Sequence, residues 1–241
     1  MKAIILNSGR GTRISHITTE KPKCLIDLDA HTTILSQQIS HFLKENISQF
    51  IITTGPFAEN VKRYVQKTFP RVPINFVHNP DYLTTNYLYS LYLTRECVDD
   101  DVLLIHGDLI FEPEILRRLL HNPQPNCIPV DTSVPNPENG FNGRIDGGLV
   151  VEIGIGLPGK NSFFVPPFYK FSKAAFQAWL KEIGKLIVQK QYQVHAENAL
   201  NMLTKKIPLT PTLINGLFCA EVDTQPDLDF VRGYWQKNRR E

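Results

Sequence analysis

This sequence is poor in the features that mark secreted, membrane-bound or zinc-binding chains. Its 4 cysteines, at positions 24, 97, 127 and 219, are far apart and form no C-x-x-C pair. We therefore expect free thiols in a reducing compartment rather than a zinc site or disulfides. No apolar run approaches the length of a membrane span, and the run after Lys2 is too short for the core of a signal peptide. These absences predict a cytoplasmic protein that does not act at a membrane.

The chain also has little net charge. Its 26 Lys and Arg residues nearly balance 24 Asp and Glu residues, which leaves a formal charge of +2. The field of the whole molecule is then too weak to attract nucleic acid or a membrane surface, so any positive patch must be local. The length of 241 residues and the 42% hydrophobic content fit one globular domain, 1–241, without repeats or low-complexity segments.

A glycine-rich segment near the N-terminus matches neither standard phosphate-binding motif. The apolar run Ala3–Leu6 suits a buried strand, and the polar loop Asn7–Arg13 follows it directly. Gly9 and Gly11 lack the spacing of a P-loop, and Ile14 stands where a dinucleotide motif needs its third glycine. The glycines alone favour a tight turn between a strand and a helix.

Four cations close to this loop change that interpretation. Arg10 and Arg13 lie within it, and Lys21 and Lys23 follow shortly after. Backbone N–H groups of a glycine-rich loop approach phosphate closely, and neighbouring cations strengthen such binding. The loop and the cations together favour an anion-binding site of the size of a triphosphate.

The first half of the chain alternates short apolar runs with amphipathic helical segments. Alternation of this kind predicts βαβ units, and therefore a Rossmann-like, mostly parallel sheet flanked by helices in an α/β fold. The strands are expected at 2–6, 50–54, 74–78 and 102–106, and the helical stripes at 34–43, 57–65 and 115–120. Gln38 is the one polar residue on the first stripe.

The second half has a different character. Residues 121–170 are rich in Pro, Gly and Asn, which favours loops and small antiparallel additions to the α/β core. Strands are expected at 127–131, 148–155, 162–165, 208–215 and 218–222, and helices at 174–187 and 196–205. A last helix is expected to start near Thr224, which can cap it.

Two aspartates follow expected strands and precede turns or helices. Asp108 comes after the strand 102–106 and Gly107, and Asp223 directly follows the strand 218–222. In an open parallel sheet, ligands bind beyond the carboxyl ends of the strands, and carboxylates there can hold Mg²⁺. A turn aspartate at 108 and helix capping by Asp223 are the competing interpretations. The presence of both acids together with the basic loop favours Mg²⁺-nucleotide chemistry.

These segments resemble the signature of the nucleotidyltransferases that activate sugar phosphates and phosphocholine. The run Ile5–Arg13 followed by Lys21–Leu25 is similar to the family pattern L-A-A-G-x-G-x-R and P-K-x-L, with Asn7-Ser8 in place of Ala-Ala. The segment 79–91 resembles one of the phosphocholine and phosphonate cytidylyltransferases. The resemblance extends over roughly the whole chain and implies the fold of the nucleotide-diphospho-sugar transferases.

The resemblance also implies residue roles. Arg13 and Lys23 would be catalytic, because they would neutralise the triphosphate in the transition state, and Asp108 and Asp223 would hold Mg²⁺. The residues expected at the nucleotide are Leu6, Asn7, Ser8, Gly9, Arg10, Gly11, Thr12, Asn86 and Ser90. The nucleotide-binding part would cover about 1–120 and the acceptor-binding part about 121–241.

The acceptor side is less defined. Arg144 and Glu197 are expected to bind the acceptor, with a surface arginine and a solvent-facing helix acid as the alternatives. Tyr82, Tyr87, Tyr89 and Trp179 could enclose a choline cation, although aromatics at such spacings usually belong to a core. His16 and His106 are interpreted as structural, and Lys23 is expected to be exposed and to matter more for turnover than for stability.

The implied reaction is transfer of CMP from CTP, with loss of pyrophosphate, to a small acceptor. The expected acceptors are a phosphonate such as 2-aminoethylphosphonate or 2-hydroxyethylphosphonate, or phosphocholine. Three alternatives stay open: a sugar-1-phosphate nucleotidyltransferase, a non-catalytic nucleotide-binding sensor, and a structural module whose cations and acids are dispersed in space. A homodimer is neither required nor excluded by the sequence.

Overall fold

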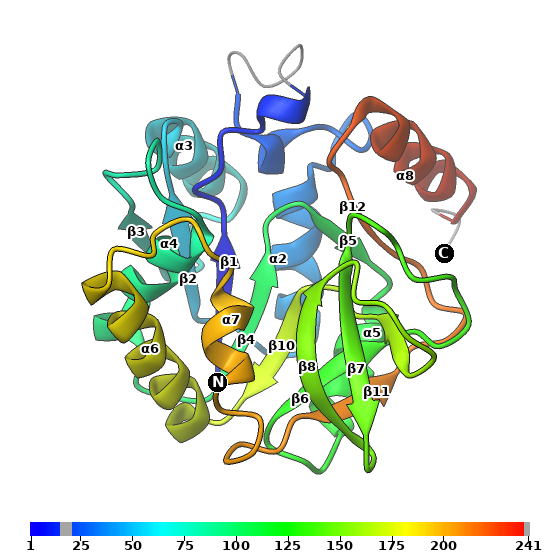
Figure 1. Cartoon of the computed structure of the whole chain (residues 1–241). Coiled ribbons are helices and arrows are strands. Elements are labelled where there is room, and N and C mark those ends of the chain that lie inside the picture. Colours follow the sequence, from blue (N-terminus) through cyan, green and yellow to red (C-terminus); the bar gives the residue numbers. More distant parts are fainter. Residues whose placement is uncertain (15–20, 239–241) are drawn as a thin grey trace.

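The computed structural model describes residues 1–14 and 21–238, so His16 lies outside the described residues. A central sheet is flanked by helices on both faces, and smaller sheets lie beside it (Figure 1). The strand order in the sheet is β11-β6-β10-β4-β1-β2-β3. These strands are β1 (Lys2–Leu6), β2 (Phe50–Thr54), β3 (Ile74–His78), β4 (Val102–His106), β6 (Cys127–Val130), β10 (Phe168–Phe171) and β11 (Thr210–Leu213).

The sheet is mostly parallel, and one strand runs against the others. Strand β1 pairs in parallel with β2 on one side and with β4 on the other, so that Leu6 lies opposite His106. Strand β10 is antiparallel to β4 and to β6, which places it between the parallel halves. The carboxyl ends of β1 and β4 therefore lie side by side, and the loops that follow them begin at the same edge.

Period-two alternation sends the side chains of β1 to two separate cores. Ile4 and Leu6 pack in one cluster with α4 (Tyr87–Leu93), α6 (Lys173–Val188) and α7 (Ala196–Asn201). Ala3 and Ile5 pack in the other cluster, together with helices on the opposite face. Those helices are α2 (Ile34–Lys44), α3 (Ala58–Thr68) and α5 (Pro113–His121). The expected Rossmann-like α/β fold is confirmed.

Smaller elements lie beside the central sheet. Two short sheets pair β5 (Leu109–Phe111) with β12 (Cys219–Glu221), and β7 (Phe141–Asp146) with β8 (Leu149–Ile155) and β9 (Ser162–Phe164). Helix α8 (Gln225–Asn238) buries Leu228 and Val231 in a third core cluster. Short 3₁₀ turns are η1 (Thr12–Ile14), η2 (Lys23–Leu25) and η3 (Thr94–Cys97).

The four strands expected in the first half of the chain are confirmed, whereas the second half differs in detail. The helix expected at 196–205 ends at Asn201, because Asn201 and Thr204 use their side chains to bond the edge of β8 at Ile153 and Val151. Strand β10 was not expected. Its sequence, Phe-Tyr-Lys-Phe, follows two prolines and places a lysine in a buried position.

All four cysteines are free, as the sequence predicts. Cys24 and Cys127 are buried, and Cys97 and Cys219 are half-buried. Within the ranges 1–14 and 21–238, no helix has both the length and the apolar character that crossing a bilayer requires.

Candidate active site

The loop after β1 is held by groups on both of its neighbouring strands. The backbone N–H of Asn7 donates to Thr53 Oγ1 of β2 at 2.9 Å. Gly107, directly after β4, lies beneath the loop, and a Cβ there would collide with the Asn7 side chain and approach the Leu6 carbonyl oxygen to 2.7 Å. A Cβ at Gly55 would likewise collide with the Ser8 carbonyl oxygen. Glycine is therefore required at both contact points for the loop to lie this close to the sheet.

Cations and carboxylates from distant parts of the chain meet at this loop. Lys23 Nζ lies 2.7 Å from Asp108 Oδ2 and 2.5 Å from Asp223 Oδ1. Arg13 Nη2 lies 2.8 Å from the same Asp223 oxygen. The two carboxylates flank one ammonium group and are separated by no more than the sum of its two distances. The structural-module alternative, in which these residues are dispersed, is therefore wrong.

Lys23 is less exposed than the sequence predicts. Its side chain is 15% exposed, because it lies between the two acids. Burial lowers the pKa of Lys23, but Asp108 and Asp223 outweigh that effect and raise the pKa above its ordinary value. Burial would raise the pKa of Asp108, yet the charge of Lys23 and then that of His106 hold it below the ordinary value. Both shifts favour the charged forms of Lys23 and Asp108.

The capping interpretation of Asp223 is wrong. Helix α8 begins at Gln225, and its start is closed by Thr224, whose hydroxyl donates to Asp227 Oδ2 at 2.8 Å. The Asp227 carboxylate also accepts from the backbone N–H groups of Asp223 and Thr224. Because these residues satisfy the helix end, the Asp223 carboxylate is directed to Lys23 and Arg13 instead.

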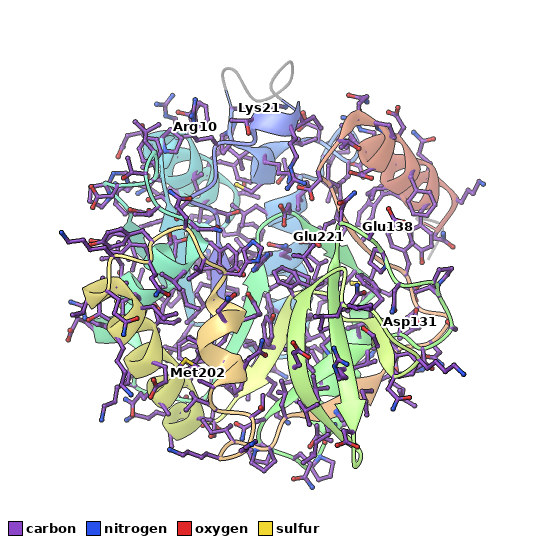
Figure 2. All side chains as sticks on the ribbon, viewed as in Figure 1. Arg10, Lys21, Asp131, Glu138, Met202 and Glu221 are labelled. Carbon is purple, nitrogen blue, oxygen red and sulfur yellow. The ribbon has the colours of Figure 1, made fainter. Side chains whose placement is uncertain are left out.

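Glu221 and His106 lie next to Asp108 and extend the cluster of charged residues. Ligand atoms of His106, Asp108 and Glu221 lie within 4.8 Å of one another. Glu221 is two positions from Asp223, and this spacing on an extended chain brings both carboxylates to one side. Figure 2 labels Glu221 near the upper end of the central strands, below the segment that carries Lys21. Burial raises the pKa of Glu221. His106, which the sequence predicts to be structural, lies beside these two acids and therefore belongs to the site as well.

The donor set fits a hard divalent cation such as Mg²⁺. Carboxylate oxygens converge from Asp108, Asp223 and Glu221, and oxygen ligands are those that Mg²⁺ prefers. Among the described residues, Asp108 Oδ1 is buried and has no hydrogen-bond partner. A buried carboxylate oxygen without a partner is costly, and a bound cation would relieve that cost.

Two pockets lie on either side of the loop. The first, which we call the loop pocket, is lined by Leu6, Asn7, Gly9, Gly11, Thr12, Arg13, Pro22, Lys23, Cys24, Gly107, Asp108 and Asp223. The second, the α4 pocket, is lined by Leu6, Ser8, Gly9, Arg10, Thr12, Asn79, Tyr82, Thr85, Asn86, Tyr87, Ser90, His106 and Asp108. All residues that the sequence predicts for the nucleotide line one pocket or the other.

The α4 pocket has an ordered polar floor. Asn79 is 1% exposed, and its Nδ2 donates to Thr85 Oγ1 and Ser90 Oγ at 3.1 and 2.9 Å. Asn86 caps α4, because its side chain accepts from the Tyr87 N–H at 2.7 Å. These bonds fix the groups that face the pocket before any ligand binds. Asn79 lies in the segment 79–91, and the resemblance implies no role for it.

A third pocket, the aromatic pocket, adjoins the acidic cluster. It is lined by Arg13, Asn86, Tyr87, His106, Asp108, Asn139, Phe141, Ile155, His195, Glu221 and Asp223. The Tyr87 ring stacks on His195 at 5.9 Å between centroids and meets His106 edge-on at 4.7 Å. Of the aromatics considered for a cation cage, Trp179 is fully buried in the core, while Tyr82 and Tyr87 line pockets. The sequence predicts no role for Phe141 or for His195, although the segment 195–200 resembles one of the phosphonate cytidylyltransferases.

Glu197 lies behind the aromatic pocket and does not line it. It is 1% exposed, so the solvent-facing alternative is wrong. Its carboxylate accepts hydrogen bonds from the hydroxyls of Tyr87 and, at 2.7 Å, of Tyr169. Burial and then the charge of Glu197 raise the pKa of both tyrosines well above the ordinary value. Glu197 therefore holds the pocket wall through Tyr87.

Arg144 is not brought together with the other candidate residues. It lies on β7, and its Nε donates to Glu152 Oε2 of the neighbouring β8 at 2.9 Å. Phe141 faces the aromatic pocket from the same strand, and side chains three positions apart on a strand point to opposite faces. The alternative of a surface arginine agrees with this position.

The chain belongs to the nucleotidyl transferase family, whose sequence profile matches residues 2–126. Among curated relatives, it is 32% identical over 128 residues to the CMP-5'-(3-aminopropyl)phosphonate synthase of Streptomyces rubellomurinus, covering 53% of this chain and 20% of that protein. It is 30% identical over 112 residues to the choline-phosphate cytidylyltransferase of Streptococcus pneumoniae, covering 46% and 47%. The matched region thus spans less than half the length of these two relatives.

The fold is also that of solved nucleotidyltransferases. The inositol-1-phosphate CTP transferase from T. maritima superposes with a TM-score of 0.80 over 99% of this chain and 96% of that one, at 18% identity. At this level of identity the likeness establishes the fold, which extends beyond the residues that the family profile matches.

Proposed function

We propose that this protein is a cytidylyltransferase that transfers CMP from CTP to a small phosphonate or to phosphocholine and releases pyrophosphate. The observation that carries the proposal is the cluster of Lys23, Arg13, Asp108 and Asp223 at the mouth of the β1 loop. It lies between the loop pocket and the aromatic pocket, both of which include Arg13, Asp108 and Asp223. A phosphoryl group held there would be open to an acceptor bound in the aromatic pocket.

The choice of base and acceptor rests on the relatives. The two curated relatives described above are named for a CMP-phosphonate and for choline phosphate. The aromatic pocket suits a small acceptor, because Tyr87, Phe141 and His195 surround it and Glu221 adds a carboxylate. Aromatic faces and a carboxylate attract an ammonium group, as in choline or an aminoalkyl phosphonate.

The proposed chemistry needs alignment and charge neutralisation. The acceptor oxygen is already ionised at neutral pH, so no side chain has to act as a nucleophile. Lys23 and Arg13 would neutralise the triphosphate, and the backbone of residues 6–12 would bind its oxygens together with the Arg10 side chain. Asp108 and Asp223 would hold Mg²⁺, which supplies charge stabilisation to a transferring phosphoryl group when bound.

Both parts of the chain would contribute residues to the acceptor-binding site. The part at about 1–120 would bind the nucleotide, with Asn86 and Ser90 near the ribose or base. The aromatic pocket draws Tyr87 and His106 from this part, and Phe141, His195 and Glu221 from the part at about 121–241. Glu197 would act on the acceptor through Tyr87. Arg144, on the other face of β7, would reach an acceptor only if β7 moved.

A pyrophosphate-release matrix tests the proposal. The four nucleoside triphosphates are combined, with Mg²⁺, with 2-aminoethylphosphonate, 2-hydroxyethylphosphonate, phosphocholine and several sugar 1-phosphates. We expect release with CTP and at least one of the first three acceptors. Release with glucose 1-phosphate alone would establish the sugar-1-phosphate alternative. Nucleotide binding without release in any combination would favour the non-catalytic sensor.

A further inference from the structure

Two polar side chains of the β1 loop are buried and unsatisfied. Among the residues that the structure describes, Asn7 Nδ2 and Ser8 Oγ have no hydrogen-bond partner. Asn7 is 9% exposed and Ser8 is 7% exposed, so solvent water cannot readily form hydrogen bonds with these side chains. Buried polar groups in folded proteins almost always have partners, because an unpaired one destabilises the fold. The unpaired pair therefore points to a partner that is not part of the chain.

The two side chains cannot easily turn away to find partners in the protein. The backbone of Asn7 is fixed by its bond to Thr53, which is fully buried. The Asn7 side chain rests on Gly107, where even a methyl group would not fit, and the Ser8 carbonyl rests in the same way on Gly55. The backbone of the loop and the Asn7 side chain are thus held in place by close contacts with both neighbouring strands.

Asn7 and Ser8 face different pockets. Successive residues of an extended chain point to opposite sides. Asn7 lines the loop pocket with Arg13 and Lys23, the two cations that would neutralise a triphosphate. Ser8 lines the α4 pocket with Asn79 and Asn86, whose amides and ordered hydroxyl neighbours suit a nucleoside. One residue therefore faces the anionic part of a nucleotide, and the next faces the sugar and base.

We infer that the side chains of Asn7 and Ser8 bind the nucleotide directly, from the two sides of the loop. The Asn7 amide donates a hydrogen bond to a phosphate oxygen, and the Ser8 hydroxyl bonds to the nucleoside. The inference rests on the proposed function, since it requires a bound nucleotide. The Ala-Ala pair in the family pattern that this loop resembles offers no such groups, so the two side chains add affinity and selectivity that a backbone loop alone lacks.

The test compares Asn7→Ala, Ser8→Ala and the double variant with the wild type. Calorimetric titration in the presence of Mg²⁺ measures the affinity for CTP and for inorganic tripolyphosphate, and thermal unfolding measures the stability of the ligand-free proteins. We expect Asn7→Ala to weaken both ligands about tenfold or more, because its bond is made to a charged acceptor. We expect Ser8→Ala to weaken CTP about fivefold to tenfold and to leave tripolyphosphate unchanged.

Ligand-free stability separates this role from a structural one. Removal of an unsatisfied buried polar group should leave the unfolding temperature unchanged or raise it, whereas loss of a structural contact lowers it. Ser162→Ala is the matched control. Ser162 is also buried, its hydroxyl also has no partner among the described residues, and it lies on β9 outside the three pockets. The control should behave like Ser8→Ala in unfolding and like the wild type in binding.

Different results overturn different claims. If the variants bind CTP as the wild type does, the inference is wrong and the proposed function stands. If binding and unfolding temperature fall together in Asn7→Ala and Ser8→Ala, the side chains are structural and the inference is again wrong. If the wild type binds none of the four nucleoside triphosphates, the proposed function fails, and the inference fails with it.

Discussion

At the scale of single residues, Lys23 joins parts of the chain that are far apart in sequence. Its two acidic partners are 85 and 200 positions away. The sequence indicates each of the three residues separately, through a basic motif and two strand ends. It does not reveal that the ammonium lies between the carboxylates, because that contact depends on how β4, β12 and η2 are packed. A lysine in this position occupies the space that a divalent cation would share with the same oxygens.

The first prediction concerns Lys23→Met. We expect turnover to fall by about a factor of 100 or more, because a positive group aimed at the transferring phosphoryl group is lost. We also expect Mg²⁺ to raise the unfolding temperature of the ligand-free variant more than that of the wild type. Without Lys23, Asp108 and Asp223 face each other without a bridging charge and bind the cation more readily. Pyrophosphate release and thermal unfolding across a MgCl₂ series measure the two effects. An equal response of both proteins to Mg²⁺ would contradict the idea that Lys23 and Mg²⁺ compete for the same carboxylates.

At the scale of elements, α2 supports the turn that carries Asp108. Gln38 is fully buried on the apolar face of this helix, and it is the residue that interrupts the hydrophobic stripe in the sequence. Its Nε2 donates to the carbonyl oxygens of His106 and Leu109 at 2.9 and 2.7 Å. These two residues bracket Gly107 and Asp108, so one side chain secures both ends of the turn. The sequence shows that a polar residue interrupts the apolar stripe, but it does not reveal which carbonyl groups that residue bonds.

The second prediction is that Gln38→Leu damages both stability and activity. Leucine fills a similar volume but leaves two buried carbonyl groups unpaired, at a cost of about 1–3 kcal/mol each. Turnover should fall further than stability explains, because the turn that orients Asp108 is released. Gln37→Leu is the matched control, since Gln37 donates to the Phe111 carbonyl and does not contact the turn. Urea denaturation and steady-state kinetics of both variants provide the comparison. Equal losses of turnover in the two would refute the positioning role.

The third prediction concerns a buried lysine, Lys170 of β10. Its Nζ donates to the carbonyl oxygens of Leu119 and Asn122 at 3.0 and 2.7 Å, at the C-terminal end of α5. A cation is favoured there by the helix dipole and by the unpaired terminal carbonyls. Lys170→Met should therefore reduce the free energy of unfolding by about 2–3 kcal/mol. Turnover of the folded fraction should stay unchanged, since Lys170 pairs with Leu103 and lies away from the β4 end that bears the site. Lost turnover in the fully folded variant would contradict this separation.

At the scale of the whole molecule, the sequence predicts the first half of the fold better than the second. Strands β1 to β4 are short segments rich in apolar residues that alternate with helices, and local pattern is sufficient to find them. Strand β10 has a lysine whose ammonium donates to carbonyl oxygens at the C-terminal end of α5, so its burial depends on tertiary contacts. The sequence does not predict the aromatic pocket, because it too depends on tertiary contacts. Phe141 begins β7 and His195 precedes α7, and they line one pocket with Tyr87 of α4 only through tertiary contacts, such as those between α7 and α4.

The fourth prediction concerns the pH dependence of stability and the buried His41 of α2. Burial, and then the nearby charges of Lys44 and Arg117, lower the pKa of His41 from 6.5 to about 4. Its ring meets Phe111 edge-on, and Gln37 Nε2 lies 3.0 Å from its Nδ1. Between pH 6.5 and 4 the unfolded chain therefore binds a proton that the folded protein does not, so stability falls as the pH falls.

His41→Gln removes this contribution and isolates it from all other titrating groups. Over the interval from pH 7 to pH 4, the wild type should lose about 3 kcal/mol more of its free energy of unfolding than the variant does. The difference should develop below pH 6.5 and level off near pH 4, the reverse of a histidine whose pKa is raised by an acidic partner. Urea denaturation of both proteins at half-unit steps of pH measures it. Two curves that stay parallel across this window would mean that His41 keeps an ordinary pKa in the folded protein, and that water or a moving helix end reaches it in spite of the packing of α2 against Phe111.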